Sequence, residues 1–162
     1  MYNPNKVHYV SATIIIVKDG KFLITKRSPN LKAFPGLWTV PGGKIESKDY
    51  ERPKDTSAHW YNVFENVLKR ETLEEVNLKI TNIKYLTSLA FKNKEDVPVL
   101  IASFYTEDFE GKIKLSPENT EFKWVNLEDA KNFELIEGIY EELEMLDKVL
   151  KGENPGEWNN RN

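Results

Sequence analysis

The chain opens with two apolar, β-branched runs separated by a two-residue polar turn. Residues 10–17 are rich in valine and isoleucine, and residues 21–26 form a second, shorter apolar run. Asp19-Gly20 between them is typical of a tight hairpin turn. The pattern predicts two antiparallel strands at the start of the fold.

A loop, a short strand and a pair of glycines follow the hairpin. Residues 28–35 contain two prolines and an asparagine, which predicts a loop, and residues 37–40 predict a short strand. The strand stops at Pro41-Gly42-Gly43, where we expect a flexible turn because glycine accepts conformations that other residues avoid. Pro-Gly-Gly taken alone is an ordinary turn.

A polar loop and a long helix come next. Residues 46–55 are charged, include a proline and predict an exposed loop. Thr56 or Ser57 is a good N-cap residue, so we expect the helix to begin there and to run to about Val76. Asn77 suits the left-handed conformation that often ends a helix.

The second half of the chain predicts further strands and two more helices. Asn126, with Asp129 three residues later, predicts the start of a short helix, and a helical spacing of apolar residues predicts a final amphipathic one. The order of elements indicates an α+β fold with a mixed or antiparallel sheet. The expected strands are residues 83–91, 97–105, 113–115 and 122–125, and the stripe of the last helix comprises Leu135, Ile139, Leu143, Leu146 and Leu150.

Size and composition indicate one folded, soluble domain. With 162 residues, 40% of them hydrophobic and 30% charged, the chain is long enough for a single core. We expect that domain to cover residues 1–150, followed by a polar, frayed tail over residues 151–162. The net charge of −3 argues against binding duplex nucleic acid through its phosphates. Cysteine is absent and no apolar run is long enough to span a membrane, so we expect a cytoplasmic protein.

The central helix combines an apolar stripe with an acidic cluster. Glu71, Glu74 and Glu75 fall on the extension of the stripe, where leucines would be expected. Like charges at this spacing repel, and a desolvated carboxylate tends to take up a proton, so something must neutralise the cluster. The apolar stripe itself comprises Trp60, Phe64, Val67 and Leu68, flanked by Tyr61 and Val63.

The acidic cluster suggests a site for a divalent cation. Mg²⁺ prefers carboxylate oxygens and completes its shell with water and phosphate oxygens. Arg70 directly precedes the cluster and can hold a carboxylate through its guanidinium group. For an isolated Arg-Glu-x-x-Glu-Glu sequence, a solvated charged face is the alternative.

Two segments together carry a resemblance to a known family. They are LWTVPGGKIE (residues 37–46) and RETLEEVNL (residues 70–78). The pair resembles the two halves of the signature of the Nudix hydrolases, a strand, glycine-rich loop and helix that binds Mg²⁺ and pyrophosphate. The resemblance covers most of residues 7–150 and implies a Nudix-like α/β/α sandwich, with a mixed sheet, a long catalytic helix and a C-terminal helix.

The chain departs from the family pattern in three places. Gly43 and Arg70 are 27 positions apart, roughly thirteen more than is usual in the family, and an exposed loop accommodates such an insertion at small entropic cost. The glutamate expected between them falls at Asp49 when counted from Gly43 and at Asn62 when counted back from Arg70, and the sequence leaves both open. The third departure is in the helix, where Asn77 replaces a glycine and Thr72 an aliphatic residue.

The resemblance implies roles for the acidic cluster and the glycines. Glu71, Glu74 and Glu75, with a backbone carbonyl of Gly42 or Gly43, would coordinate Mg²⁺ or Mn²⁺. Such ions neutralise the pyrophosphate oxygens and activate a water for in-line displacement. We therefore expect a Nudix-type hydrolase that acts on phosphoric anhydride bonds, with a nucleoside diphosphate linked to another group as its substrate.

Further candidates lie outside the acidic cluster. By resemblance, Glu118 is the favoured base to deprotonate the water, with Glu121 or a helix glutamate as alternatives, although either residue can equally be a surface acid. The aromatic candidates could stack on a nucleobase, but an aromatic beside a strand more often belongs to the core. The expected substrate-binding residues are Arg27, Lys44, Phe34, Trp38 and Gly43.

The sequence leaves the substrate open among nucleoside triphosphates, oxidised nucleotides, nucleotide sugars, ADP-ribose and dinucleotides. The oligomeric state, a homodimer included, and the role of the insertion at residues 47–58 are open as well. A catalytically silent domain of the same fold that senses a nucleotide is the alternative function, and the intact acidic triplet favours the enzyme.

Overall fold

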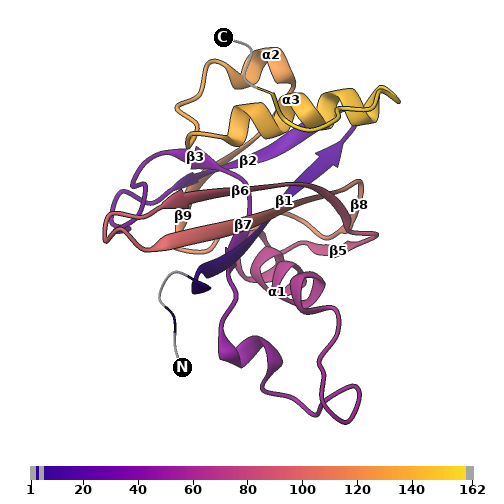
Figure 1. Ribbon diagram of the computed structural model, residues 1–162. Coiled ribbons are helices and arrows are strands. Elements are labelled where there is room, and N and C mark those ends of the chain that lie inside the picture. Colours follow the sequence, from indigo (N-terminus) through magenta and orange to yellow (C-terminus); the bar gives the residue numbers. More distant parts are fainter. Residues whose placement is uncertain (1–2, 4–5, 160–162) are drawn as a thin grey trace.

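A mixed sheet of seven strands lies between two long helices (Figure 1). The computed structural model describes residue 3 and residues 6–159. The strands are β1 (Tyr9–Lys18), β2 (Lys21–Arg27), β3 (Trp38–Thr39), β4 (Gly42–Lys44), β5 (Lys79–Thr81), β6 (Lys84–Lys92), β7 (Pro98–Thr106), β8 (Asp108–Glu110) and β9 (Asn119–Val125). The helices are the 3₁₀ helix η2 (Ser47–Tyr50) and the α-helices α1 (Val63–Val76), α2 (Leu127–Ala130) and α3 (Ile139–Leu150).

The sheet topology sets α1 and α3 on opposite faces. The strand order is β3-β2-β1-β7-β6, with β4 also paired to β1 and β9 to β2, while β5 and β8 form a separate two-stranded sheet. Strands β1 and β7 run parallel to each other. Helix α1 contacts β1, β4 and β5, and α3 covers the other face of the sheet (Figure 1). This arrangement confirms the predicted α+β fold with its α/β/α sandwich.

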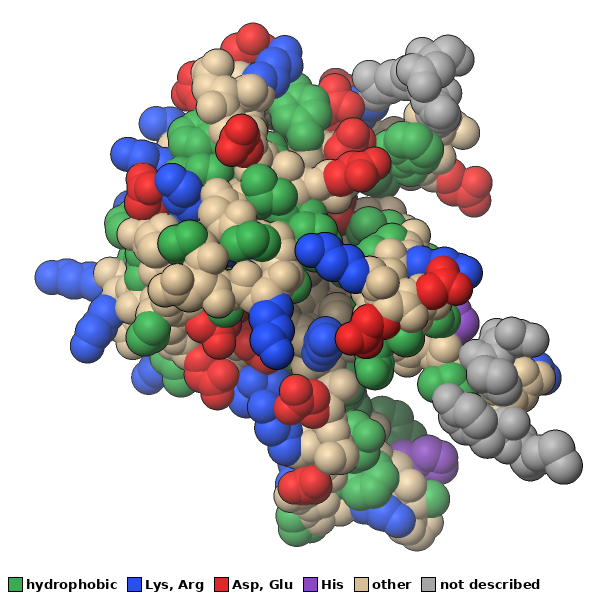
Figure 2. Space-filling view, turned by 90° about the vertical axis from the view of Figure 1, so that its left-hand side faces the viewer, with side chains coloured by type: hydrophobic (Ala, Val, Ile, Leu, Met, Phe, Trp, Pro, Cys, Tyr) green, Lys and Arg blue, Asp and Glu red, His purple; other side chains and the backbone are tan. Residues whose placement is uncertain are grey.

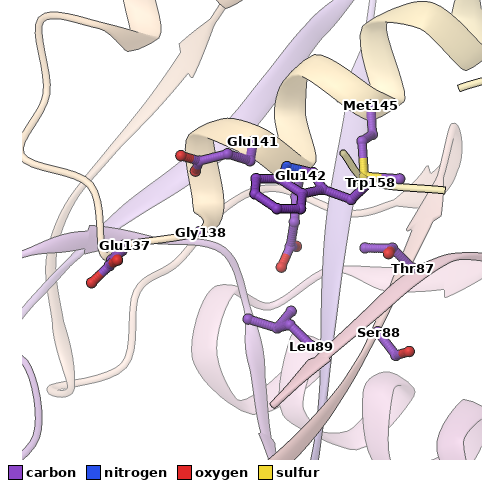
Figure 3. Close-up of a pocket in the computed structure, with 9 residues that line it drawn as sticks. All are labelled: Thr87, Ser88, Leu89, Glu137, Gly138, Glu141, Glu142, Met145 and Trp158. Atoms are coloured by element: carbon purple, nitrogen blue, oxygen red, sulfur yellow. The ribbon is translucent and has the colours of Figure 1, made fainter. Parts of the chain in front are cut away.

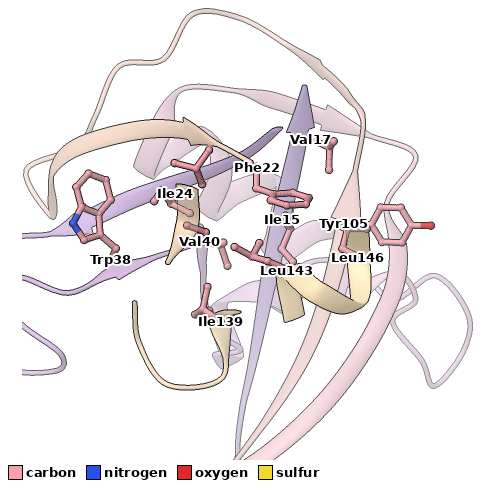
Figure 4. Close-up of a cluster of buried hydrophobic side chains, with 12 residues drawn as sticks. Ile15, Val17, Phe22, Ile24, Trp38, Val40, Tyr105, Ile139, Leu143 and Leu146 are labelled. Carbon is pink, nitrogen blue, oxygen red and sulfur yellow. The ribbon is translucent and has the colours of Figure 1, made fainter. Parts of the chain in front are cut away.

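Strand β1 is buried on both faces, which explains its continuous apolar run. Ile14 and Ile16 point toward the core cluster that packs with α1, whereas Ile15 and Val17 point toward the cluster that packs with α3. Figure 4 shows the second cluster, in which Leu143 of α3 faces the strands. The central strand therefore joins two cores.

The predicted hairpin and helix end are confirmed. Asp19 and Gly20 have φ values of 50° and 72°, which is the backbone of a type I′ turn between β1 and β2. Asn77 has a φ of 60°, and its backbone N–H donates to the carbonyl of Leu73, while the N–H of Leu78 donates to the carbonyl of Thr72. Asparagine tolerates this left-handed conformation, so it ends α1 as expected.

The expectation of a flexible glycine turn is wrong. Gly42 and Gly43 belong to β4 and pair antiparallel with Thr13 and Ala12 of β1. Neither glycine has a positive φ. A Cβ at Gly42 would collide with the backbone of β1, so glycine is needed here for close approach rather than for an unusual backbone angle.

The expected helix start at Thr56 or Ser57 is wrong. Helix α1 begins at Val63, after Asn62 in the left-handed region with a φ of 53°. Thr56 uses its hydroxyl to accept the backbone N–H of His59 at 3.1 Å, which closes a local turn instead of starting a helix. The expected stripe residues Trp60 and Tyr61 therefore lie outside the helix.

The insertion is folded, although its residues are largely exposed. The indole of Trp60 donates to the carbonyl of Arg52 at 2.8 Å, and its ring packs on Tyr50 with 5.6 Å between centroids. Arg52 also forms an ion pair with Asp55 at 2.7 Å. The segment projects from the lower end of the molecule in Figures 1 and 2. The predicted exposed loop at residues 46–55 is confirmed except at η2, and these local contacts order the segment.

The expected strand at residues 113–115 is not formed. Lys114 and Ser116 donate their backbone N–H groups to the carbonyls of Val76 and Glu75 at the end of α1. Ile113 packs against the core on the α1 side. The apolar pattern here reflects packing onto the helix rather than a strand ladder.

The C-terminal part follows the prediction, except that Leu135 of the expected stripe lies before α3. Asn126 accepts the backbone N–H of Asp129 at 2.7 Å and caps α2. Residues 151–159 contain no helix or strand, and residues 160–162 of the expected tail lie outside the described residues. None of the helices within the described ranges is long and apolar enough to cross a membrane.

Candidate active site

Two carboxylates of α1 lie against the glycine pair of β4. The backbone N–H of Gly42 donates to Oε2 of Glu75 at 3.3 Å. A Cβ at Gly43 would collide with the carboxylate of Glu71, so that side chain lies directly over the glycine. The structure thus brings the two sequence motifs together at one edge of the sheet.

Glu74 has a different position from its two neighbours. Its side chain is 59% exposed, and it forms an ion pair with Arg70 at 3.2 Å. The sequence placed all three glutamates on the inward stripe, and this is wrong for Glu74. One helical turn separates it from Arg70, so the exposed flank of the helix is where the two side chains meet.

Arg70 connects the helix to the insertion. Its Nε donates to Oδ1 of Asp49 at 2.9 Å, and Nη2 lies 2.7 Å from the same oxygen. Its Nη1 is 2.8 Å from Oε1 of Glu71. The Asp49 side chain is only 2% exposed. Of the two positions that the sequence left open, Asp49 makes the contact with Arg70, while Asn62 precedes the first residue of α1.

Burial dominates the electrostatics of the two inward carboxyls. Burial raises the pKa of Glu75 to about 8, and the negative charges of Glu71 and Glu118 add to the rise, while the Gly42 N–H and Arg27 oppose it. Burial also raises the pKa of Glu71, against the lowering effect of Arg70. A cation close to these two carboxyls would stabilise their ionised forms and so lower their pKa values.

The donor set fits a divalent metal in its chemistry. Among the residues that the structure describes, no group of three or more histidine, cysteine, aspartate or glutamate side chains is arranged to hold a metal ion. Glu71 and Glu75 nevertheless present carboxylate oxygens, which Mg²⁺ prefers, beside the backbone of Gly42 and Gly43. Burial makes both carboxyls harder to ionise, and a divalent cation beside them would favour their charged forms.

Two further predicted residues lie near this edge. The charges of Glu118 and Arg27 both act on Glu75. The carbonyl of Glu118 accepts the backbone N–H of Ser28 at 2.8 Å, which holds the loop before β9 beside the end of β2. Glu121, in contrast, is held by Lys26 in an ion pair at 2.9 Å.

The remaining predicted residues have mixed environments. Lys44 lies over the ring of Tyr9, with 5.1 Å from Nζ to the centroid. Phe34 is 42% exposed, has a φ of 50° and makes an edge contact with Phe91 at 6.5 Å. Trp38 is 7% exposed and belongs to the core beside α3. Phe34 is therefore the more accessible of the two aromatic candidates.

One polar group was missed in the sequence. Glu142 of α3 is 5% exposed, and its Oε2 accepts the Ser103 hydroxyl at 2.5 Å. Ser103 lies 3.0 Å from the hydroxyl of Thr13. Glu142 is three residues after Ile139 and four before Leu146, so the stripe test applied to the central helix could have found it.

Comparison with known proteins identifies the family. The NUDIX domain model matches residues 7–146. The 8-oxo-dGTP diphosphatase of Buchnera aphidicola subsp. Schizaphis graminum is 32% identical over 119 residues, which cover 74% of this chain and 78% of that protein. The nucleoside triphosphatase NudI of Escherichia coli is 26% identical over 131 residues, which cover 75% and 84%.

The fold agrees with this match. The crystal structure of a MutT protein from Methanosarcina mazei Go1 superposes with a TM-score of 0.71 at 25% identity, and covers 91% of this chain and 98% of that one. The family model spans well over half of the sequence. The chain therefore belongs to the NUDIX domain family.

Proposed function

We propose that this chain is a metal-dependent pyrophosphohydrolase that cleaves a nucleoside diphosphate linked to another group, by attack of water at phosphorus. The family match and the two relatives make the chain a Nudix-type hydrolase that acts on phosphoric anhydride bonds. The proposal of a metal-dependent reaction rests on one observation. The half-buried carboxyls of Glu71 and Glu75 lie directly against the backbone of Gly42 and Gly43.

The metal site of this proposal consists of residues from both motifs. Glu71, Glu74 and Glu75, with the carbonyl of Gly42, would hold Mg²⁺ or Mn²⁺. When bound, the ion neutralises the phosphate oxygens and lowers the pKa of a water. Glu74 joins the site by leaving its exposed ion pair with Arg70, which costs little because such pairs contribute about 0–1 kcal/mol.

The remaining residues position the reacting groups. Asp49 holds Arg70, and Arg70 holds the carboxylate of Glu71. A carboxylate that is already held in place loses less entropy when it binds a metal ion. Glu118 is the base that takes the proton of the attacking water, because Glu121 is already engaged by Lys26. Arg27 and Lys44 supply positive charge along the phosphate path.

Nucleoside triphosphates are the first substrates to test. Both relatives named above carry a nucleoside triphosphate activity in their names. Phe34, exposed and held against Phe91, offers a face for a heterocycle. Nucleotide sugars, ADP-ribose and dinucleotides complete the panel.

The test is the release of phosphate or pyrophosphate from this panel with Mg²⁺ or Mn²⁺ and with EDTA. Turnover of at least one substrate that EDTA abolishes supports the proposal. The rival is a catalytically silent domain that senses a nucleotide. Tight binding of a nucleotide without turnover of any compound, under both metals, would favour that rival.

A further inference from the structure

Two features of the structure lie outside the candidate metal site. One is a pocket of about 270 Å³ between β6 and α3, on the opposite face of the sheet from α1 (Figure 3). The other is the segment between η2 and α1, residues 51–62, which projects from the lower end of the molecule (Figure 1). Of the two, only the segment joins directly onto α1, the helix that carries Glu71 and Glu75.

A bidentate ion pair holds the two ends of this segment together. Arg52, two residues after η2, donates from Nη1 to Oδ1 of Asp55 at 2.7 Å and from Nη2 to Oδ2 at 2.8 Å. The same Nη2 donates to the carbonyl of Tyr61 at 3.1 Å, and the backbone N–H of Tyr61 donates to Oδ2 of Asp55 at 2.8 Å. Tyr61 lies two residues before the first residue of α1. These contacts tie the chain that leaves η2 to the chain that enters α1.

Trp60 adds contacts at the same place. Its indole N–H donates to the carbonyl of Arg52 at 2.8 Å, and its ring packs on Tyr50, the last residue of η2, with 5.6 Å between centroids. Arg52, Asp55, Trp60 and Tyr61 together are called the clasp below. The clasp therefore fixes the end of η2 as well as the start of α1.

The charged pair of the clasp has a fixed geometry. Arg52 and Asp55 meet through two parallel hydrogen bonds, and such a fork is more specific in orientation than a single lysine contact. The hydrogen bonds from Arg52 and from the Tyr61 N–H lower the pKa of Asp55 to about 2. The pair therefore stays charged at neutral pH.

The clasp lies one contact away from the group that holds Glu71. Asp49 is part of η2, and its Oδ2 accepts the backbone N–H of Glu46 at 2.8 Å while its Oδ1 accepts Nε of Arg70 at 2.9 Å. Arg70 in turn pairs with Glu71 at 2.8 Å. Helix η2 is thus attached to α1 at two points, through the clasp before the first turn and through Asp49 about two turns further on.

Loop closure makes the second attachment depend on the first. Asp49 and Arg70 are 21 positions apart, and the entropic cost of bringing two such residues together rises with the length of the chain between them. The clasp joins Arg52 to Tyr61, which are nine positions apart, and so removes these positions from the loop that Asp49 and Arg70 must close. A shorter connection of fixed direction keeps Asp49 close to Arg70.

We propose that Arg52 and Asp55 are positioning residues, which close the insertion so that Asp49 stays on Arg70 and Arg70 orients the carboxylate of Glu71. This inference rests on the proposed function, in which Glu71 holds the metal ion. The insertion separates the two halves of the sequence signature, and its own internal ion pair restores the connection between them.

The test uses the full-length protein and two variants of the clasp. Asp55→Asn removes the charge and keeps an acceptor for the Tyr61 N–H, and Arg52→Lys keeps the charge and loses the fork. Asp96→Asn is the matched control, because Asp96 forms an exposed ion pair with Lys92 at 2.9 Å and asparagine accepts its φ of 59°. The Nε–H signal of Arg70 is recorded by NMR in metal-free, isotope-labelled protein, and kcat, KM and the melting temperature are measured alongside.

Both clasp variants should move the Arg70 Nε–H signal toward the position of a solvated arginine and speed its exchange with water. They should lower kcat by roughly 3- to 10-fold, less than the loss of Asp49 itself, because they act one contact further from the metal ligand. KM should stay within about 2-fold, since the substrate contacts are unchanged. The melting temperature should hardly change, because exposed ion pairs contribute little to global stability. Asp96→Asn should leave all four quantities unchanged.

An Arg70 signal that neither variant moves overturns the inference, even if kcat falls, because the effect would then reach the site by another route. An unchanged kcat beside a displaced Arg70 signal overturns it as well. If the unmodified protein hydrolyses no compound of the panel, the proposed function fails, and the Arg70 signal still shows whether the clasp holds Asp49 on Arg70. A fall in kcat of equal size in Asp96→Asn would show a general effect of charge and contradict the role of the clasp.

Discussion

Arg70 of α1 forms an ion pair with Asp49 of η2, with 2.7 Å between Nη2 and Oδ1. The two residues are 21 positions apart in the chain, and most of the folded insertion lies between them. Because Arg70 also contacts Glu71, the insertion is coupled to a carboxylate of the candidate active site. The insertion does not disrupt this contact, because η2 packs against α1 and only the residues after η2 project outward.

Replacing Asp49 tests this coupling. Asp49→Ala removes a buried acceptor from Arg70, and we expect a loss of about 1–3 kcal/mol in the free energy of unfolding. Turnover should fall by about 10- to 100-fold, as is typical when a group that orients a metal ligand is lost. Chemical denaturation and steady-state kinetics measure both effects. Asn62→Gly is the matched control, since glycine accepts the φ of 53° at that position. Equal losses in the two variants would contradict the role of Asp49.

The metal assignment predicts a link between ion binding and stability. Mg²⁺ should raise the melting temperature of the unmodified protein, because a ligand that binds only the native state stabilises it. Glu75→Gln should remove that rise and lower turnover by orders of magnitude while the fold persists. Glu65→Gln, in the first turn of the same helix, is the control and should retain both properties. A metal-dependent rise that survives in Glu75→Gln would exclude Glu75 as a ligand.

The two glycines of β4 should respond differently to the same substitution. Gly42→Ala places a Cβ against the backbone of β1, which cannot yield cheaply, so we expect strong destabilisation or failure to fold. Gly43→Ala meets only the end of the flexible Glu71 side chain, so the protein should fold and lose activity through displacement of that carboxylate. Thermal melting and kinetics on both variants check the contrast. Similar melting temperatures for the two would show that β4 is less tightly held than the structure indicates.

Burial of Glu142 predicts a dependence of stability on pH. Burial raises the pKa of this carboxyl from 4.5 to about 7, with the Glu141 charge adding to the rise and the Ser103 hydrogen bond opposing it. The folded state therefore holds a proton that the unfolded state releases, so the free energy of unfolding falls as pH rises from 4.5 to about 7. The total contribution is on the order of 3 kcal/mol.

Denaturation of the protein and of Glu142→Gln between pH 4.5 and 8 measures this contribution. The difference between the two curves isolates Glu142 from Glu75, whose raised pKa gives a fall of the same sign that continues to about pH 8. Parallel curves across the whole range would show that Glu142 is ionised in the folded protein.

Much of the fold followed from local signals in the sequence. The Asp19-Gly20 turn, the Asn77 helix end and the Asn126 cap each depend on a conformation or hydrogen bond within a few residues, and each is confirmed. The start of α1 was missed because Thr56 can close a single turn as readily as it can cap a helix. Local propensity does not distinguish these outcomes, and the packing of Trp60 on Tyr50 decides between them.

The acidic cluster was also predicted only in part from the sequence. Its presence and the family resemblance came from residue types and spacing, which are properties of the sequence. The outward position of Glu74 did not, because a helical wheel assigns faces by angle and takes no account of the ion pair that Arg70 offers on the flank.

The sequence by itself determined most of the order of elements, the family and the residue types that we propose to hold metal and phosphate, because these depend on short-range pattern. Only the tertiary structure decided that Asp49 rather than Asn62 meets Arg70 and that Gly42 needs to be glycine for close strand pairing. It alone joined Thr13, Ser103 and Glu142, from three distant segments. Such contacts arise from strand register and from the way the two helices pack on the sheet, and no local stretch of sequence encodes that geometry.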